Sequence, residues 1–166
     1  FSVAGLLLGR IAGMKSRYAF ALVFGSHALC LGVLLLQGAP EESYVMWGDL
    51  MIYDRLTHLS KCLIAGFGLF FVVFASDYMQ DEDMLVEEML LLVQLQAIGM
   101  MALVASGHWI SIVVSMELSV LPVYALVVLR REDKKALEAG VKYMLMGIVA
   151  TALMVYGVSV VYSLVG

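Results

Sequence analysis

Two ionisable side chains interrupt apolar stretches in the second half of the chain. Glu117 lies within one apolar run, and Lys142 lies within the next, after a short charged turn at Arg130–Glu138. A charge near the centre of a bilayer costs about 2.5–3.5 kcal/mol even on insertion scales, so such residues usually serve a function. Proton transfer is the chemistry available to a carboxylate and an ammonium at this depth. We therefore take Glu117 and Lys142 as candidate site residues.

The position of Glu117 favours a functional carboxylate. At 1.5 Å per residue, it lies roughly 20 Å from Arg130 along a helix, near the bilayer midplane. Pro122 removes a backbone donor and leaves the carbonyl of Leu118 without its helical partner, so a kink beside the carboxylate could admit water. A structural alternative is a protonated Glu117 that bonds to a neighbouring helix. A tolerated kink at Pro122 is an equally good alternative.

Lys142 and the other polar residues of the apolar runs have structural alternatives too. Lys142 lies roughly 10 Å past Lys135, so its side chain could also extend back to the membrane surface. Gln94 and Gln96 are expected to bond across helices, and His27 is expected to be an interfacial or core residue. The sequence leaves these alternatives open.

The composition is that of an integral membrane protein. Of 166 residues, 63% are hydrophobic and 14% charged, with a mean hydropathy of +0.96, whereas soluble domains are about half apolar and a quarter charged. Long apolar runs favour helices over barrel strands. Nucleic-acid binding is excluded because no basic patch with interleaved aromatic residues occurs.

The expected fold is an all-α membrane protein, a bundle of transmembrane helices with one partial and five complete spans. A spanning helix needs about 20 mainly apolar residues. The partial helix is Phe1–Gly9, and we expect the chain to be a piece of a longer polypeptide. The complete spans are Tyr18–Gln37, His58–Ser76, Leu85–Ala105, Ile110–Leu129 and Ala139–Leu164.

The connections between the spans carry turn and charge signals. Tyr44–Asp54 is rich in β-formers with a Gly-Asp turn at its centre, which predicts a short hairpin on the membrane surface. Asp77–Asp83 is an acidic loop, and Ser106–Trp109 is a very short turn. Most cations fall on one side of the alternating spans, which the positive-inside rule assigns to the cytoplasm. They are Arg10, Lys15, Arg17, Arg130, Arg131, Lys134 and Lys135.

From Glu88 to the end, the motifs follow a known pattern. The chain resembles the N subunit of respiratory NADH:quinone oxidoreductase (complex I), an antiporter-like proton-channel subunit. The motifs that carry the resemblance are Glu88, IGMM at Ile98–Met101, SGHW at Ser106–Trp109, MELSVLPVY at Met116–Tyr124, EAGVKY at Glu138–Tyr143 and the small-residue helix up to Tyr162.

The resemblance implies a fold, a function and a place for the site. Residues 1–84 would be the N-terminal helices with a periplasmic hairpin, and residues 85–166 the first three helices of an antiporter-like fold with inverted repeats. Glu117 and Lys142 would be the fifth- and sixth-helix members of a proton path, and the principal lysine partner of Glu117 would lie on a helix absent here.

The resemblance also implies partners, cofactors and a location. The partners would be the other membrane subunits of complex I, including a neighbouring antiporter-like subunit, together with the lipid bilayer. NADH, flavin, iron–sulfur clusters and quinone would be bound by partner subunits, with no cofactor in this chain. The location would be the bacterial inner membrane.

Two other functions remain open at this point. The related M and L subunits and the D subunit of Mrp-type cation/proton antiporters have similar motifs, although EAGVKY favours the N subunit. A non-transporting membrane scaffold, in which the buried charges only fix helix register, is the alternative from another class.

The clustering of cations gives a testable topology. Cysteines introduced at Lys134 and Glu42 should differ in their reaction with an impermeant thiol reagent applied to intact cells, because position 134 faces the cytoplasm and position 42 the periplasm. Labelling at position 42 alone is expected. Preferential labelling at position 134 would reject this orientation.

Overall fold

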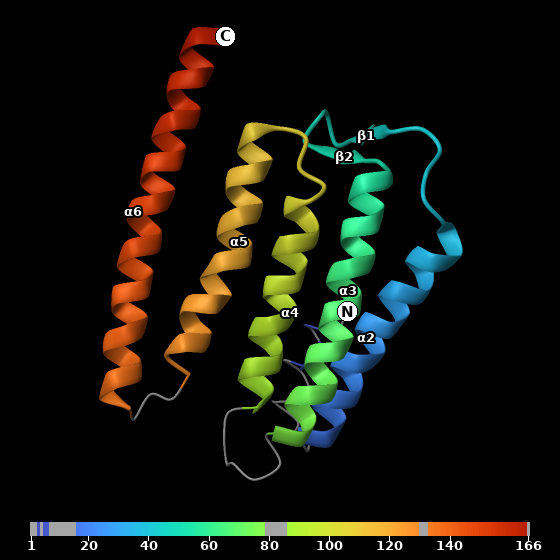
Figure 1. The fold of residues 1–166 in the computed structure, drawn as a ribbon, viewed down its shortest axis with the longest axis vertical. Helices are drawn as coiled ribbons and strands as arrows, with labels where there is room; N and C mark the ends of the chain where they lie inside the picture. Colours follow the sequence, from blue (N-terminus) through green and yellow to red (C-terminus); the bar gives the residue numbers. More distant parts are fainter. Residues whose placement is uncertain (1–2, 4, 7–15, 79–85, 130–132, 166) are drawn as a thin grey trace.

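The computed structural model describes residues 3, 5–6, 16–78, 86–129 and 133–165. Five helices in these ranges are long and apolar enough to cross a membrane, which confirms the expected all-α membrane bundle and its five complete spans. Figure 1 shows the helices and a small hairpin at one end of them. In chain order the elements are α2 (Ser16–Gln37), β1 (Tyr44–Met46), β2 (Met51–Tyr53), α3 (Arg55–Tyr78), α4 (Val86–Leu103), α5 (Trp109–Val127) and α6 (Lys134–Val165).

Some expected segments lie outside the described residues. These are most of the partial helix Phe1–Gly9, the cations Arg10, Lys15, Arg130 and Arg131, and the acidic loop beyond Tyr78. Arg17, which we expected in a loop, belongs to α2, since this helix begins at Ser16. The difference is within the usual uncertainty of a helix boundary.

Two helices begin earlier than the hydropathy suggested, because an aspartate caps each of them. The Oδ1 of Asp54 accepts a 2.7 Å hydrogen bond from the backbone of Thr57, so α3 begins at Arg55. The Oδ1 of Asp133 accepts one of 2.8 Å from the backbone of Lys135, so α6 begins at Lys134. Backbone and side-chain bonds from Thr57 hold the pKa of Asp54 below its ordinary value. Charged first turns therefore extend both spans.

The predicted hairpin is confirmed. Strands β1 and β2 pair antiparallel, with Tyr44 opposite Tyr53 and Met46 opposite Met51. The chain reverses through Trp47, Gly48 and Asp49, whose φ angles are 57°, 62° and 70°. Glycine and aspartate adopt this left-handed region more readily than most residues, which explains the Gly-Asp turn signal.

The hairpin is attached to the short turn between α4 and α5. The backbone N–H of Ile52 donates to the Ala105 carbonyl at 2.7 Å, and that of Gly107 donates to the Leu50 carbonyl at 2.9 Å. The hydroxyl of Ser111 donates to the same Leu50 carbonyl at 2.7 Å. The hairpin therefore connects the start of α3 to the start of α5.

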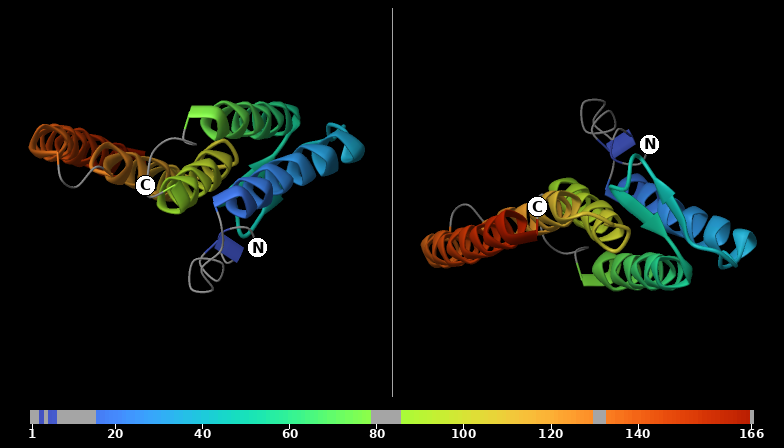
Figure 2. Two further views of the ribbon diagram at one scale, coloured as in Figure 1. Left: turned by 90° about the horizontal axis from the view of Figure 1, so that it is seen from below. Right: turned by 90° about the horizontal axis from the view of Figure 1, so that it is seen from above.

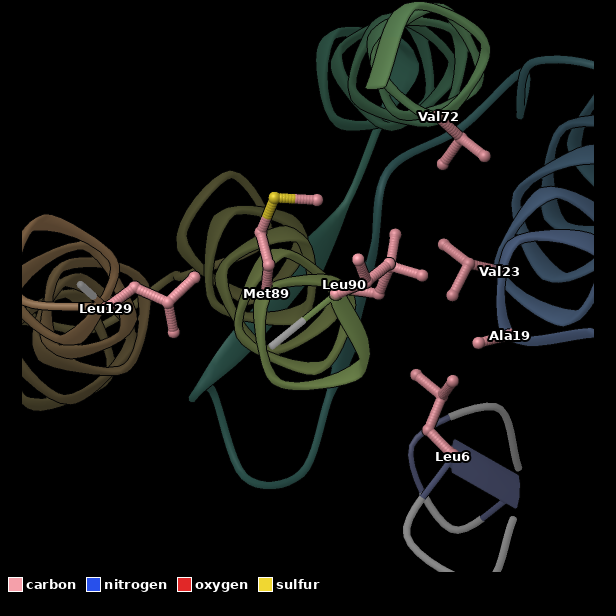
Figure 3. Packing of buried hydrophobic residues seen from close by; sticks show 8 residues of the cluster. Leu6, Ala19, Val23, Val72, Met89, Leu90 and Leu129 are labelled. Atoms are coloured by element: carbon pink, nitrogen blue, oxygen red, sulfur yellow. The ribbon is translucent and has the colours of Figure 1, made fainter. Parts of the chain in front are cut away.

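The helices are arranged in a row with a corner. Viewed from either end, α4, α5 and α6 follow one another in a line, and α2 and α3 lie beyond α4 (Figure 2). The apolar core lies where α2, α3 and α4 meet. There Leu90 of α4 faces Ala19 and Val23 of α2, with Val72 of α3 nearby (Figure 3). Helix α6 packs against α5 at the open end of the row.

Helices α4 and α5 approach each other closely at a glycine. A Cβ added at Gly99 of α4 would lie 2.6 Å from the Cα of Ser119 and 2.7 Å from the carbonyl carbon of Leu118. Ser115 and Ser119 are buried on the facing side of α5. Small residues allow membrane helices to approach this closely. Close van der Waals packing drives helix association in lipid, because the hydrophobic effect does not act between helices there.

The predicted cross-helix bond of Gln94 is confirmed. Its Nε2 donates to the hydroxyl of Ser26 on α2 at 2.6 Å, and the Ser26 hydroxyl donates to the carbonyl of Val23 at 2.8 Å. Gln94 is buried, so an amide at this depth needs such a partner. His27 is buried, so of the two positions expected for it, interfacial or core, the structure shows the core.

The contact at Gly99 predicts a difference between two glycine-to-alanine variants. Gly99→Ala should lower the free energy of unfolding by about 1–3 kcal/mol, because the added methyl overlaps the α5 backbone. Gly66→Ala is the matched control, since a Cβ there has nothing within 4 Å. It should be neutral or stabilising by up to about 1 kcal/mol through helix propensity. Unfolding of the assembled protein in detergent measures both, and equal stability of the two variants would contradict a tight crossing.

Candidate functional site

Helix α5 places Glu117 near the middle of the membrane. The helix starts after His108, whose Nδ1 accepts from the backbone of Ile110 at 3.3 Å and whose own N–H donates to Ser111 Oγ at 3.2 Å. Glu117 then lies roughly 12 Å from the first residue and 15 Å from the last residue of α5. Its side chain is half-buried in this chain.

Thr151 of α6 is the hydrogen-bond partner of Glu117. Its Oγ1 donates to Glu117 Oε1 at 2.6 Å. An ionised carboxylate only accepts, so a hydroxyl donor suits its charged form. No cation lies within ion-pair distance of Glu117 among the residues that the structure describes. The contact joins α5 to α6 at mid-membrane depth.

Aromatic and small residues continue from Glu117 towards the end of the bundle where α6 begins. Tyr124 lies two turns further along the same face of α5 and is 8% exposed. Its ring makes an edge contact with Tyr143 of α6, with centroids 5.2 Å apart. Gly147 lies directly beneath its hydroxyl, where a Cβ would overlap the oxygen. The two helices therefore approach closely through a tyrosine and a glycine.

A cavity of about 610 Å³ lies between α5 and α6 on this side of Glu117. Its walls are mostly apolar, so the phenol of Tyr124 is its main polar group. The lining residues are Leu121, Tyr124, Ala125, Val128, Leu137, Gly140, Val141 and Met144. The cavity extends from the first turns of α6 towards the carboxylate.

Lys142 forms a pair within α6. Its Nζ donates to Glu138 Oε1 at 2.5 Å, one turn earlier, and the two side chains are 72% and 66% exposed. An exposed pair of this kind contributes little to stability, about 0.3–0.5 kcal/mol. The pair therefore keeps a protonatable carboxylate and an ammonium together near the start of α6.

The structure does not bring Glu117 and Lys142 together. Lys142 precedes Thr151, the residue that contacts Glu117, by roughly 14 Å along α6. Pro122 is buried inside α5, which continues through it as one helix. The kink at Pro122 stays a prediction. The two candidate site residues occupy different depths on neighbouring helices.

Thr151, Tyr124 and Gly147 are not among the site residues that the sequence predicts. A threonine in an apolar helix more often donates to the carbonyl one turn before it, so its type alone does not identify a partner. The available signal is depth, because Thr151 lies about as far into α6 as the middle of the membrane requires. To identify Glu117 as its partner, one must know how α6 is oriented about its own axis, which the sequence does not give.

Comparisons with known proteins show what the chain is similar to. The transmembrane family described as NADH:quinone oxidoreductase/Mrp antiporter matches residues 106–166, which include both candidate site residues. Subunit N of NADH-quinone oxidoreductase from Rhodobacter capsulatus is 32% identical over 98% of this chain and 34% of its own length. The same subunit of a Jannaschia species is 29% identical over 100% of this chain and 34% of its own. That of Francisella tularensis is 31% identical over 98% and 33%.

The matches differ in how much of each protein they cover. The chain spans about one third of the length of the curated relatives that it matches. The similarity covers nearly all of its own residues, including the helices before Glu88. The chain is therefore a multi-pass membrane protein that is similar to subunit N of NADH-quinone oxidoreductase, and its residues 106–166 match the transmembrane family of the oxidoreductase and Mrp antiporters.

Proposed function

We propose that this chain forms part of a proton-translocating membrane subunit of NADH:quinone oxidoreductase, with Glu117 as the group that takes up and releases the proton. The observation that carries the proposal is the position of Glu117. It is a half-buried carboxylate in the middle of a spanning helix, and a hydroxyl from the next helix donates to it at 2.6 Å. A charge is expensive there, so a purely structural role would be served better by an amide or a hydroxyl.

The environment of Glu117 suits a group that changes its protonation state. In its ionised form it accepts from Thr151, and in its protonated form its own O–H can donate to a lone pair of that hydroxyl. A cation brought within about 4 Å would favour the ionised form by about 4 kcal/mol at an effective dielectric of 20. That corresponds to a change of about a thousandfold in proton affinity. Movement of such a cation would therefore load or unload the carboxylate.

The pair of Lys142 and Glu138 supplies a second protonatable station. It lies near the start of α6, within the stretch of the helix that also lines the cavity. The hydroxyl of Tyr124 lies between these two levels and can both donate and accept. We propose that protons pass from the cytoplasmic side by way of this pair towards Glu117, with water in the intervening cavity.

The redox chemistry belongs to partner subunits in this proposal. The described residues do not fit an iron–sulfur cluster, since Cys30 and Cys62 are separate thiols and no group of three His, Cys, Asp or Glu converges there. We place NADH, flavin, the iron–sulfur clusters and the quinone site in those partners, and the assembly in the bacterial inner membrane. The neighbours of this chain would be other membrane subunits of the complex, including one of the antiporter type.

The first test replaces Glu117 in the whole complex. Glu117→Gln keeps the shape and the bond to Thr151 but cannot ionise. It should lower proton pumping into membrane vesicles at least tenfold, since one proton-transfer group typically accounts for about 10²–10⁴ of a rate. Proton uptake, NADH oxidation and subunit content are measured together. Glu42→Gln, at an exposed carboxylate outside the spans, is the matched control and should pump normally.

The same assay distinguishes the alternatives. Thr151→Val should weaken pumping and Thr151→Ser should restore it, because only the hydroxyl contacts the carboxylate. Pumping by assembled Glu117→Gln at the normal ratio of protons to electrons would show a structural glutamate and refute the mechanism. A flux that requires sodium would instead assign the chain to cation/proton antiport.

The second test concerns Lys142. If its ammonium belongs to the proton path, Lys142→Ala should lower proton translocation several-fold more than Lys142→Arg, with the complex still assembled. Lys134→Ala, at an exposed lysine in the first turn of the same helix, is the control and should have little effect. Equal pumping by all three variants would show that Lys142 only extends to the membrane surface.

A further inference from the structure

A second cavity, of about 710 Å³, lies between α3 and α4, with one residue each from α2 and α5 in its wall. Both of these helices are membrane spans, so the cavity lies at membrane depth. Three polar side chains line it, and every other wall is apolar or a glycine. The lining residues are His27, Ser60, Leu63, Ile64, Phe67, Gly68, Phe71, Met89, Val93, Gln96, Ala97, Met100, Val104 and Leu126.

His27 presents an unused acceptor to this cavity. The residue is 3% exposed, and its Nδ1 lies 3.1 Å from the carbonyl of Val23. A carbonyl only accepts, so Nδ1 carries the proton. In a neutral imidazole the second ring nitrogen carries no proton. Nε2 is therefore an acceptor, and within the described ranges no group donates to it.

The missing side chain of Gly68 opens the way from Nε2 to the cavity. A Cβ at this position would overlap both Cδ2 and Nε2 of His27. The ring edge therefore lies against the bare backbone of α3, and Gly68 is itself a wall of the cavity. Any larger residue would cover the nitrogen.

Gln96 brings a second polar group to the same depth. It is half-buried and makes no hydrogen bond within the part of the chain that the structure describes. His27, Gly68 and Gln96 each lie roughly 15 Å from the same end of the bundle along their helices. An amide without a partner is costly at this depth, where water is scarce. An acceptor and an amide thus line the same, mostly apolar cavity at a similar depth.

We propose that this cavity binds a lipophilic molecule that carries a single hydroxyl. The hydroxyl donates to Nε2 of His27 and accepts from the amide of Gln96, while an aliphatic or aromatic body fills the space along Leu63, Phe67 and Met100. A hydroxyl is the smallest group that does both. The volume is within the range of small-molecule sites, about 300–1,000 Å³. It far exceeds the roughly 30 Å³ of a water molecule.

The test uses two photoreactive probes that differ only in the hydroxyl. A diazirine-bearing octanol and the corresponding octane are added, at equal membrane concentrations, to vesicles that contain the whole assembled complex. Crosslinks are mapped by mass spectrometry to α3 and α4. We expect the octanol to label the cavity walls about tenfold more than the octane, the effect of a buried hydrogen bond. Unlabelled octanol should also reduce the labelling by the octanol probe at about tenfold lower concentration than unlabelled octane does.

Variants tie the labelling to the two polar groups. His27→Leu and Gln96→Leu should each reduce labelling by the octanol about tenfold and leave labelling by the octane unchanged, which shows that the cavity persists. Gln37→Leu, at an exposed position at the end of α2, should change neither. Equal labelling by the two probes in the wild-type complex would overturn the proposal. Absence of labelling would overturn it as well, because another helix would then occupy the space.

Discussion

The close approach of α4 and α5 at Gly99 fixes the orientation of the carboxylate. Gly99 lies against the backbone of Leu118 and Ser119, the two residues that follow Glu117. This contact settles which side of α5 faces α4, so Glu117 projects from a different side, where α6 can reach it. A side chain at Gly99 would force the helices apart and turn α5 about its axis. The position of the carboxylate therefore depends on the absence of a side chain on another helix.

Polar side chains at mid-membrane depth are paired between helices in a consistent way. Gln94 donates to Ser26 across α4 and α2, and Thr151 donates to Glu117 across α6 and α5. Lipid offers no hydrogen bonds, so each polar group placed in a span must find a partner in the protein. Such bonds are worth about 0.6 kcal/mol each in membranes. They specify which helix faces which more than they stabilise the bundle.

Much of the fold follows from the sequence because membrane spans need only length and apolar composition. The five spans and the hairpin at Gly48 and Asp49 were predictable in this way. The early starts of α3 and α6 were not, because Asp54 and Asp133 extend charged turns that hydropathy assigns to loops. Glu117 and Lys142 were recognisable as charges in apolar runs. The contact of Glu117 with Thr151 was not, because it depends on how α6 is rotated relative to α5.

The attachment of the hairpin has a consequence for how the chain is assembled in the membrane. The outer edge of β2 is closed by residues that come more than fifty positions later, in the turn between α4 and α5. That edge remains open during synthesis until two further helices have crossed the bilayer. Exposed strand edges can pair with strands of other chains. Because β2 has only three residues, it offers few backbone groups for such pairing. The hairpin, α3 and α4 thus become a closed unit only when the second of those crossings is complete.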